Sequence, residues 1–115
     1  MRLVLVVLVS LAVAGAATAT APPVGALPAG PVSTITTQRG ELVSIALTSR
    51  AGLSWRIARP FDGHIVREVA EADVGTRVVV VFKAVGRGRT KLVYAQTRGE
   101  SSRAQAARTF SIVVR

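Results

Sequence analysis

Hydrophobic and polar residues alternate with a period of two through most of the chain beyond residue 33. In the segment ELVSIAL (41–47), Val43, Ile45 and Leu47 fall on one side of an extended backbone, and polar or small residues fall on the other. This period, carried by β-branched and aromatic residues, is typical of β-strands with one buried face. An edge strand is expected near residues 33–38, and five further segments extend the pattern: LSWRIA (53–58), HIVREVA (64–70), TRVVVVFKA (76–84), RTKLVYAQ (89–96) and TFSIVVR (109–115).

The number and spacing of these segments predict the fold class. Turn residues separate the segments at intervals of roughly 8–12 residues, which favours an antiparallel sandwich or barrel. Seven short strands in about 80 residues fit an all-β, immunoglobulin-like sandwich. No segment has a convincing helical period, and residues 67–75 (REVAEADVG) are interpreted as the connection between the fourth and fifth strands.

The segment VFKAVGRGRTKLVYAQTRG (81–99) supports two incompatible interpretations. Its Gly-Arg-Gly-Arg centre resembles the basic, glycine-rich segments that bind single-stranded nucleic acid, whereas its flanks resemble two strands joined by a tight turn. Nucleic-acid binding requires aromatic residues among the basic ones, because bases stack on them, and the Gly-Arg-Gly-Arg centre has none. We therefore interpret Gly86 and Gly88 as turn residues and expect no nucleic-acid partner. Tyr94 is predicted to face inward and to hydrogen-bond a backbone group through its hydroxyl.

The N-terminal region predicts export. Residues 1–19 combine an early positive charge at Arg2, an apolar run and small residues before a cleavage site after Ala19, which is the pattern of a signal peptide. The apolar run is shorter than the roughly 20 residues that cross a bilayer. We expect a secreted protein or one of the cell envelope or periplasm, with no stable membrane span after cleavage. Residues 20–33 form a linker rich in proline, alanine and glycine, and residues 34–115 form a single domain.

The composition excludes several kinds of chemistry. The chain has no cysteine and one histidine, so disulfides, thiolate metal sites and multi-histidine metal sites are not expected. A hydrolase triad of His64, Asp73 and a serine would also need a nucleophile turn and an oxyanion site, and no Gly-x-Ser-x-Gly segment occurs. Glu68 and Glu71 are interpreted as solvated residues of a turn. The sequence predicts a protein that is not an enzyme.

The excess of basic residues leaves two interpretations open. The formal net charge is +9, and cleavage of the export signal removes only Arg2 from the charged residues. The arginines either form a solvated surface or attract an acidic partner, such as an anionic envelope polymer, a lipid surface or an acidic protein. Arg50 and Arg98 are expected on adjacent loops at one end of the sandwich, and residues 97–108 (TRGESSRAQAAR) are expected to form a long, mobile loop. The arginines expected in loops or at outward strand positions are Arg50, Arg56, Arg59, Arg98, Arg103 and Arg108.

Residues 39–115 resemble the chagasin family of cysteine-peptidase inhibitors. The resemblance is carried by RGELVSIAL (39–47), Trp55 after the next turn, FKAVGRGRTKLVY (82–94) and the closing strand TFSIVVR. It implies an exported, monomeric, immunoglobulin-like sandwich that binds and occludes the cleft of a papain-like cysteine peptidase. The family does so with three loops at one end of the sandwich, without chemistry or a cofactor of its own.

The resemblance also implies where the contact residues lie. The family's three loops carry Asn-Pro-Thr-Thr-Gly, Gly-x-Gly-Gly and Arg-Pro-Trp, and this sequence departs from all three motifs. The first loop is two residues shorter and lacks the proline, the second keeps one glycine, and the third has neither proline nor tryptophan. The corresponding partner-binding residues here are Arg50, Ala51, Gly52, Asp73, Val74, Gly75, Gln96, Thr97, Arg98 and Gly99.

These departures lower the expected affinity. Losing one buried aromatic anchor and two stiffened loops costs about 5 kcal/mol, or between three and four powers of ten in affinity. A nanomolar inhibitor would become a micromolar one. The alternative is an exported binding module that no longer inhibits peptidases and uses the same basic loops to contact an acidic envelope or extracellular partner.

Overall fold

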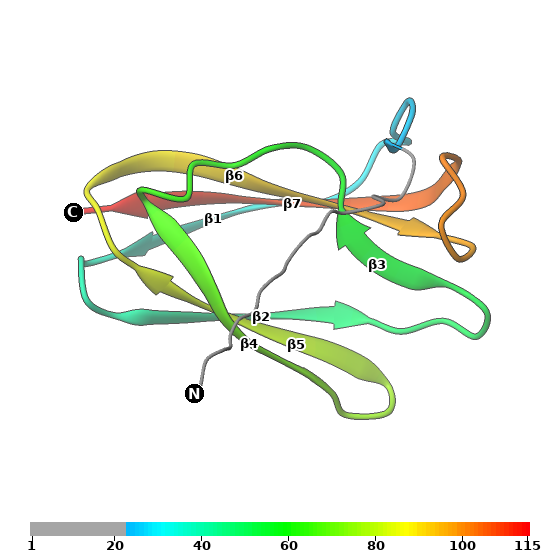
Figure 1. Ribbon diagram of the computed structural model, residues 1–115, viewed down its shortest axis with the longest axis horizontal. Coiled ribbons are helices and arrows are strands. Elements are labelled where there is room, and N and C mark those ends of the chain that lie inside the picture. Colours follow the sequence, from blue (N-terminus) through cyan, green and yellow to red (C-terminus); the bar gives the residue numbers. More distant parts are fainter. Residues whose placement is uncertain (1–22) are drawn as a thin grey trace, which may run out of the picture.

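The computed structural model describes residues 23–115, which form seven β-strands in two layers and no helix (Figure 1). The all-β, immunoglobulin-like sandwich is therefore confirmed. The predicted export signal lies outside the described residues. The strands are β1 (Val32–Thr37), β2 (Leu42–Thr48), β3 (Ser54–Ile57), β4 (Val66–Asp73), β5 (Arg77–Ala84), β6 (Gly88–Thr97) and β7 (Ala104–Val114).

The strands divide into a four-stranded sheet of order β1-β7-β6-β3 and a three-stranded sheet of order β2-β5-β4. All neighbouring strands are antiparallel except β1 and β7, which run parallel. The predicted turn around Gly86 joins strands of different sheets, since β5 and β6 do not pair. Gly86 is required there, because a Cβ atom on it would overlap the backbone carbonyl oxygen of His64.

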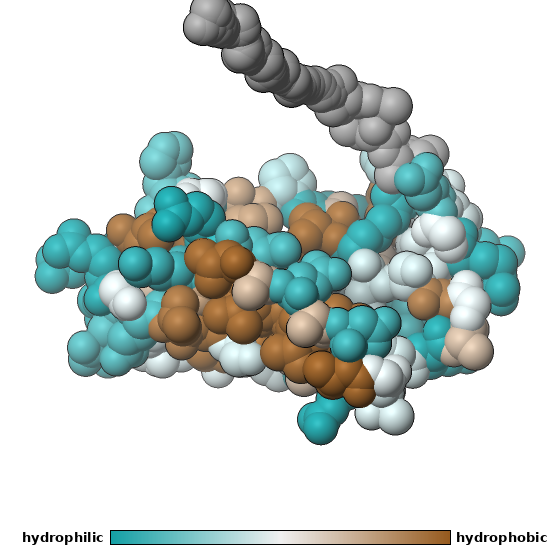
Figure 2. All heavy atoms as spheres, turned by 60° about the horizontal axis from the view of Figure 1, so that its bottom comes forward, coloured by the Kyte–Doolittle hydropathy of each residue, from teal (hydrophilic) through white to brown (hydrophobic). Residues whose placement is uncertain are grey.

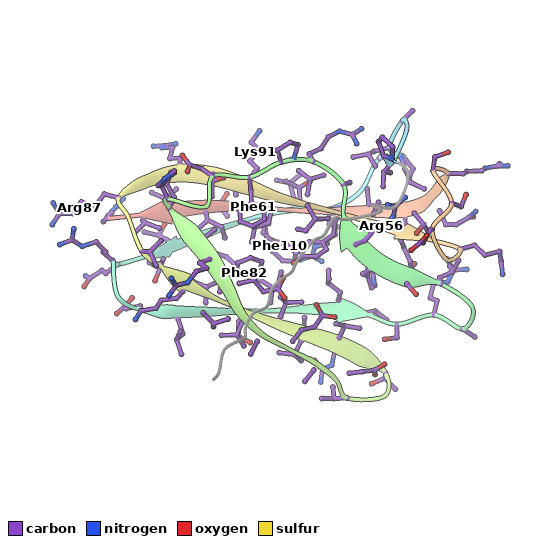
Figure 3. All side chains as sticks on the ribbon, viewed as in Figure 1. Arg56, Phe61, Phe82, Arg87, Lys91 and Phe110 are labelled. Atoms are coloured by element: carbon purple, nitrogen blue, oxygen red, sulfur yellow. The ribbon has the colours of Figure 1, made fainter. Side chains whose placement is uncertain are left out.

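The core fills the space between the sheets. Val43, Ile45 and Leu47 alternate with exposed residues along β2 and are each at most 5% exposed, as the period of two predicts. Phe82 and Phe110 enter the core from opposite sheets (Figure 3). Phe82 packs edge-on against another aromatic ring, with a centroid distance of 5.8 Å, and Phe110 packs edge-on against Tyr94 at 6.4 Å. Burial of these side chains stabilises the sandwich without disulfides.

Two predicted loops are wrong. Most of residues 67–75 belong to β4, so Glu68 and Glu71 lie on a strand and not in a turn. The long loop predicted at 97–108 shortens to residues 98–103, because β7 already begins at Ala104. Both segments are polar or alanine-rich. Strand β4 exposes seven of its eight residues at the edge of a sheet, so it shows no buried alternation.

The segment before β1 lies against the domain. Val24 is 6% exposed, and the Gly25 amide donates a hydrogen bond to the Ser102 carbonyl at 2.8 Å. The Arg59 guanidinium donates to the carbonyl oxygens of Val24 and Gly25 at 3.0 and 2.9 Å. Ordered contacts therefore begin upstream of residue 34, where the sequence analysis places the start of the domain.

Tyr94 faces inward as predicted, but its hydroxyl is not bonded as predicted. The side chain is 4% exposed, and its buried oxygen has no hydrogen-bond partner. Burial, followed by the nearby carboxylates of Glu68 and Glu71, raises the pKa of the phenol well above its ordinary value. The Tyr94 ring therefore contributes packing to the core, and its hydroxyl forms no hydrogen bond with the backbone.

Candidate functional site

Three connections meet at one end of the sandwich, at the right of Figure 1. They are residues 49–53 between β2 and β3, residues 74–76 between β4 and β5, and residues 98–103 between β6 and β7. They meet because β2, β4 and β6 all run toward this end, as the strand registers require. We call these three connections the rim loops.

Specific contacts hold the rim loops side by side. The Ser49 amide donates to the Thr76 carbonyl at 2.9 Å and joins the first two loops. The third loop reaches the first through Arg98, since a Cβ atom built on Gly52 would lie 3.2 Å from the Arg98 guanidinium. The Trp55 indole nitrogen donates to the Thr48 carbonyl at 2.8 Å and fixes β3 against the end of β2.

The second loop is a tight turn built from its own polar groups. The Asp73 carboxylate accepts a hydrogen bond from the Gly75 amide at 2.9 Å, and the Val74 amide donates to the Arg77 carbonyl at 2.9 Å. Gly75 has φ of 93°, a left-handed conformation that glycine adopts without strain. The single glycine that this loop retains is thus the one that its turn requires.

Eight of the ten predicted contact residues are exposed on the rim. They are Arg50, Ala51, Gly52, Asp73, Val74, Gly75, Arg98 and Gly99. The other two are buried in β6: Gln96 is 1% exposed and Thr97 is fully buried. The Gln96 side-chain amide donates to the Thr48 carbonyl at 3.4 Å, and the Thr97 hydroxyl donates to the Gly99 carbonyl at 2.7 Å. These two residues support the loops from below and do not present side chains to a partner.

The alternation of residues along β6 explains the burial of Gln96. Leu92 and Tyr94 face inward, and Gln96 continues the same parity along β6. Ala95 and Thr97 have the opposite parity and are fully buried as well, so both faces of β6 are covered near its end. Burial of the second face depends on tertiary packing and leaves no signal in the alternation of a single sequence.

A cleft of about 770 Å³ lies beside the first two rim loops, between the edges of the two sheets. Its walls include the Trp55 ring and the carboxylates of Glu71 and Asp73, and the Ser49 hydroxyl on it is buried without a hydrogen-bond partner. The alternation of residues in the sequence does not predict this cleft. A register shift in β4 between Glu68 and Ala70 turns Glu71 and Asp73 toward the side of the sheet that carries the core.

The arginines divide into two groups. Arg56 donates to the Ser101 carbonyl at 2.8 Å, Arg59 binds the segment before β1, and Arg108 donates to the Ser33 hydroxyl at 2.9 Å. These three guanidinium groups hold segments of the domain together. Arg50, Arg98 and Arg103 remain exposed at the rim, which leaves them available for an acidic partner.

His64 lies on the surface of the domain. This side chain is fully exposed beside Asp62, at the end of the sandwich opposite the rim loops. Within residues 23–115, no cluster of three or more acidic or histidine side chains is placed to hold a metal ion. Over the same residues, no helix of membrane-spanning length and hydropathy occurs.

Comparison with known proteins yields similar structures but no similar sequences. No protein-family model matches the chain, and no curated protein matches it. The crystal structure of the cysteine protease inhibitor EhICP2 from Entamoeba histolytica matches with a TM-score of 0.58 at 16% identity, over 76% of this chain and 99% of that chain. The fold is chagasin-type.

Two further solved structures are similar. The solution structure of amebosin matches with a TM-score of 0.50 at 22% identity, over 71% of this chain and 88% of that chain. The structure of PbICP-C in complex with falcipain-2 matches with a TM-score of 0.47 at 19% identity, over 80% of this chain and 95% of that chain. The comparison with EhICP2 thus confirms the chagasin-type sandwich that the sequence motifs predict.

Proposed function

We propose that the protein is a reversible inhibitor of papain-like cysteine peptidases that lays its rim loops across the active-site cleft. One observation carries the proposal: a chagasin-type sandwich brings three exposed loops together at one end, where eight of the ten predicted contact residues are exposed, seven on the loops and Asp73 at the end of β4. EhICP2, which shares the fold, is a cysteine protease inhibitor. Inhibition by occlusion needs no catalytic group, metal or cofactor.

The rim is suited to occlusion because its loops are short and supported from below. Trp55, Gln96 and Thr97 each hydrogen-bond a backbone carbonyl at the base of the loops, so part of the ordering cost of binding is met in the free protein. The loops lack a proline-stiffened segment and a protruding aromatic anchor. We therefore expect inhibition at about micromolar concentration.

The experiment is a titration of papain with the protein, measured through hydrolysis of a small fluorogenic peptide. The proposal predicts reversible loss of activity at about micromolar inhibitor, with the inhibitor chain left uncut. A serine peptidase assayed in parallel should keep its activity. Full papain activity at a hundredfold higher concentration would contradict the proposal.

A second candidate function rests on the exposed Arg50 and Arg98. In it, the protein is an exported, non-inhibitory module whose rim binds an acidic envelope or extracellular partner. Both candidates assume a monomer that is secreted or held in the cell envelope after removal of residues 1–19, and neither involves nucleic acid. Capture of an acidic partner by the protein, lost on R50E/R98E and combined with no inhibition of papain, would favour this module.

A further inference from the structure

The outer face of the β2-β5-β4 sheet carries an apolar area, shown in brown in Figure 2. In antiparallel strands, directly paired residues lie on the same side of the sheet, so the registers identify the residues of this face. Four rows cross it: Leu42, Lys83 and Arg67; Ser44, Val81 and Ala70; Ala46, Val79 and Ala72; and Thr48 with Arg77.

Charge is distributed unevenly across this face. Its charged residues are Arg67, Lys83 and Arg77, and none is a carboxylate. The acids of β4 lie on the other side of the sheet, because Glu68, Glu71 and Asp73 pair with residues of β5 that face the core. The face therefore has a purely cationic margin.

The cations flank the apolar rows. Lys83 and Arg67 lie in the first row and Arg77 in the last, six residues away along β5, which is about 20 Å of strand. The two rows between them contain only serine, alanine and valine. Leu42 is 63% exposed, and Val69, at the irregularity in β4, is 45% exposed.

We propose that this face docks on the surface of an anionic lipid bilayer. Arginine and lysine have long aliphatic stems, so the three cations can contact phosphate headgroups while the apolar rows meet the boundary of the acyl chains. Each cation near an anionic surface adds attraction that disappears at high salt. The apolar centre, the cationic margin and the lack of carboxylates all complement such a surface.

Other occupants fit this face less well. Protein–protein interfaces usually depend on aromatic or arginine anchor residues. The two middle rows contain no side chain larger than valine, so they provide no such anchor. A second copy would bring two sets of the same cations together, between chains that each carry a formal net charge of +9. A bilayer requires only area and opposite charge.

Docking of this face would leave the rim loops free. The rim loops lie at the ends of the strands, whereas the proposed contact covers the flat of one sheet (Figure 1). With that sheet against the bilayer, the strands would lie along the membrane plane and the rim would point sideways. The protein could then meet a peptidase while adsorbed on a membrane.

The test is co-sedimentation with lipid vesicles, using residues 20–115, which contain the whole sandwich. Vesicles of phosphatidylcholine with phosphatidylglycerol should bind the protein at low salt, and pure phosphatidylcholine vesicles should bind it at least about tenfold more weakly. R67E/K83E should reduce binding to the anionic vesicles by about 30-fold or more. L42D should reduce it by about tenfold.

Matched controls separate this face from net charge and from general hydrophobicity. R89E/K91E is the control for R67E/K83E, because it makes the same change of charge on the four-stranded sheet. V32D is the control for L42D, because Val32 is an exposed apolar residue of the four-stranded sheet. Both controls should bind within about threefold of the unchanged protein. Far-UV circular dichroism checks that each variant is folded.

The proposal would be overturned if each control variant lost as much vesicle binding as the variant it is matched to. Equal binding to both kinds of vesicle, or no binding at low salt, would also overturn it. A concentration-dependent dimer that R67E/K83E or L42D alters would overturn it in favour of a second copy on this face. Papain inhibition is measured separately on the same variants, so failure of membrane docking and failure of the proposed function can be told apart.

Discussion

The two ends of the sandwich are built differently. At the end opposite the rim, backbone hydrogen bonds tie the turn between β1 and β2 to the C-terminal residue and to β5. Arg39 donates to the Arg115 carbonyl at 3.0 Å, and Gly40 donates to the Ala84 carbonyl at 2.7 Å, while Ala84 donates back to Glu41 at 2.9 Å. At the rim, one backbone hydrogen bond, from Ser49 to Thr76, joins two of the three loops within the described residues.

This difference separates stability from recognition. At the end opposite the rim, which we call the closed end, backbone hydrogen bonds and the close approach of Gly86 to the His64 carbonyl fix the path of the chain. The rim loops are exposed and hold their shape through a few side chains beneath them, so their residues can change while the fold remains. A chain with this fold can therefore lose the family's loop motifs and keep the scaffold that presents them.

The largest effect should follow a substitution at the closed end. Gly86→Ala places a Cβ atom closer to the His64 carbonyl oxygen than van der Waals contact allows, so the β5–β6 connection must move. We expect a loss of about 3 kcal/mol in the free energy of unfolding, measured by urea denaturation. Gly63→Ala is the control, because a Cβ atom there meets nothing within 4 Å, and its cost should be below about 1 kcal/mol. Equal costs for the two would refute the claim that the closed end is rigid.

A double charge reversal at the rim should affect binding and spare the fold. Arg50→Glu with Arg98→Glu removes two of the three exposed arginines of the rim loops, together with the contact of Arg98 with the first loop. Inhibition of papain should weaken by tenfold or more, about 1.4 kcal/mol, with the free energy of unfolding changed by less than about 0.5 kcal/mol.

The control for this reversal is Arg87→Glu with Arg89→Glu, which makes the same change of charge at the closed end, where Arg87 points outward (Figure 3). Inhibition that falls equally in both double variants would mean that net charge, and not the rim, determines binding.

A smaller effect should follow removal of one support of the rim. Trp55→Phe keeps an aromatic ring but removes the hydrogen bond from the indole to the Thr48 carbonyl. The expected loss is about 1 kcal/mol in the free energy of unfolding, together with weaker inhibition. Circular dichroism is the appropriate probe, because Trp55 is the single tryptophan of the chain. An unchanged free energy of unfolding would show that this bond does not fix the loop.

The smallest effect at neutral pH should be that of Tyr94→Phe. The buried hydroxyl has no partner, so its removal should change the free energy of unfolding by less than about 0.5 kcal/mol. Burial raises the pKa of the phenol in the folded state, so the unfolded chain loses this proton first as the pH rises above the ordinary tyrosine value of 10.0. The stability that the neutral phenol contributes is present below that pH and is lost above it.

The unchanged protein should therefore lose more stability above pH 10.0 than Tyr94→Phe does, as thermal melts over that pH range would show. Parallel loss in both proteins would indicate that Tyr94 ionises normally in the folded state.

The sequence predicted the strands with buried alternation and missed the features that depend on pairing. The alternation of β2 and the turn at Gly86 were predictable, because each follows from local residues, whereas Gly88, also predicted as a turn residue, is the first residue of β6. Strand β4 could not be distinguished from a connection, since its pattern is interrupted by a register shift and nearly all of it is exposed. The acidic wall of the cleft depends on the same shift.

The candidate site was predictable in position and only partly in composition. The ends of alternating strands located the rim loops, and eight of the ten residues are exposed there, seven on the loops and Asp73 at the end of β4. Gln96 and Thr97 are buried because pairing with β7 continues to the end of β6. Only the paired structure shows how far a strand extends, so the boundary between support and contact could not be found from spacing alone.

The central claim is that the rim end meets the peptidase and the closed end does not. It is tested most directly by recording amide NMR spectra of the isotope-labelled protein during addition of papain whose active-site cysteine is blocked by a small methylthio group. The account predicts that the affected amides lie in residues 49–53, 74–76 and 98–103, with those around Gly40 and Gly86 unchanged. Perturbation centred on Gly40 and Gly86, or none at a hundredfold above micromolar papain, would contradict it.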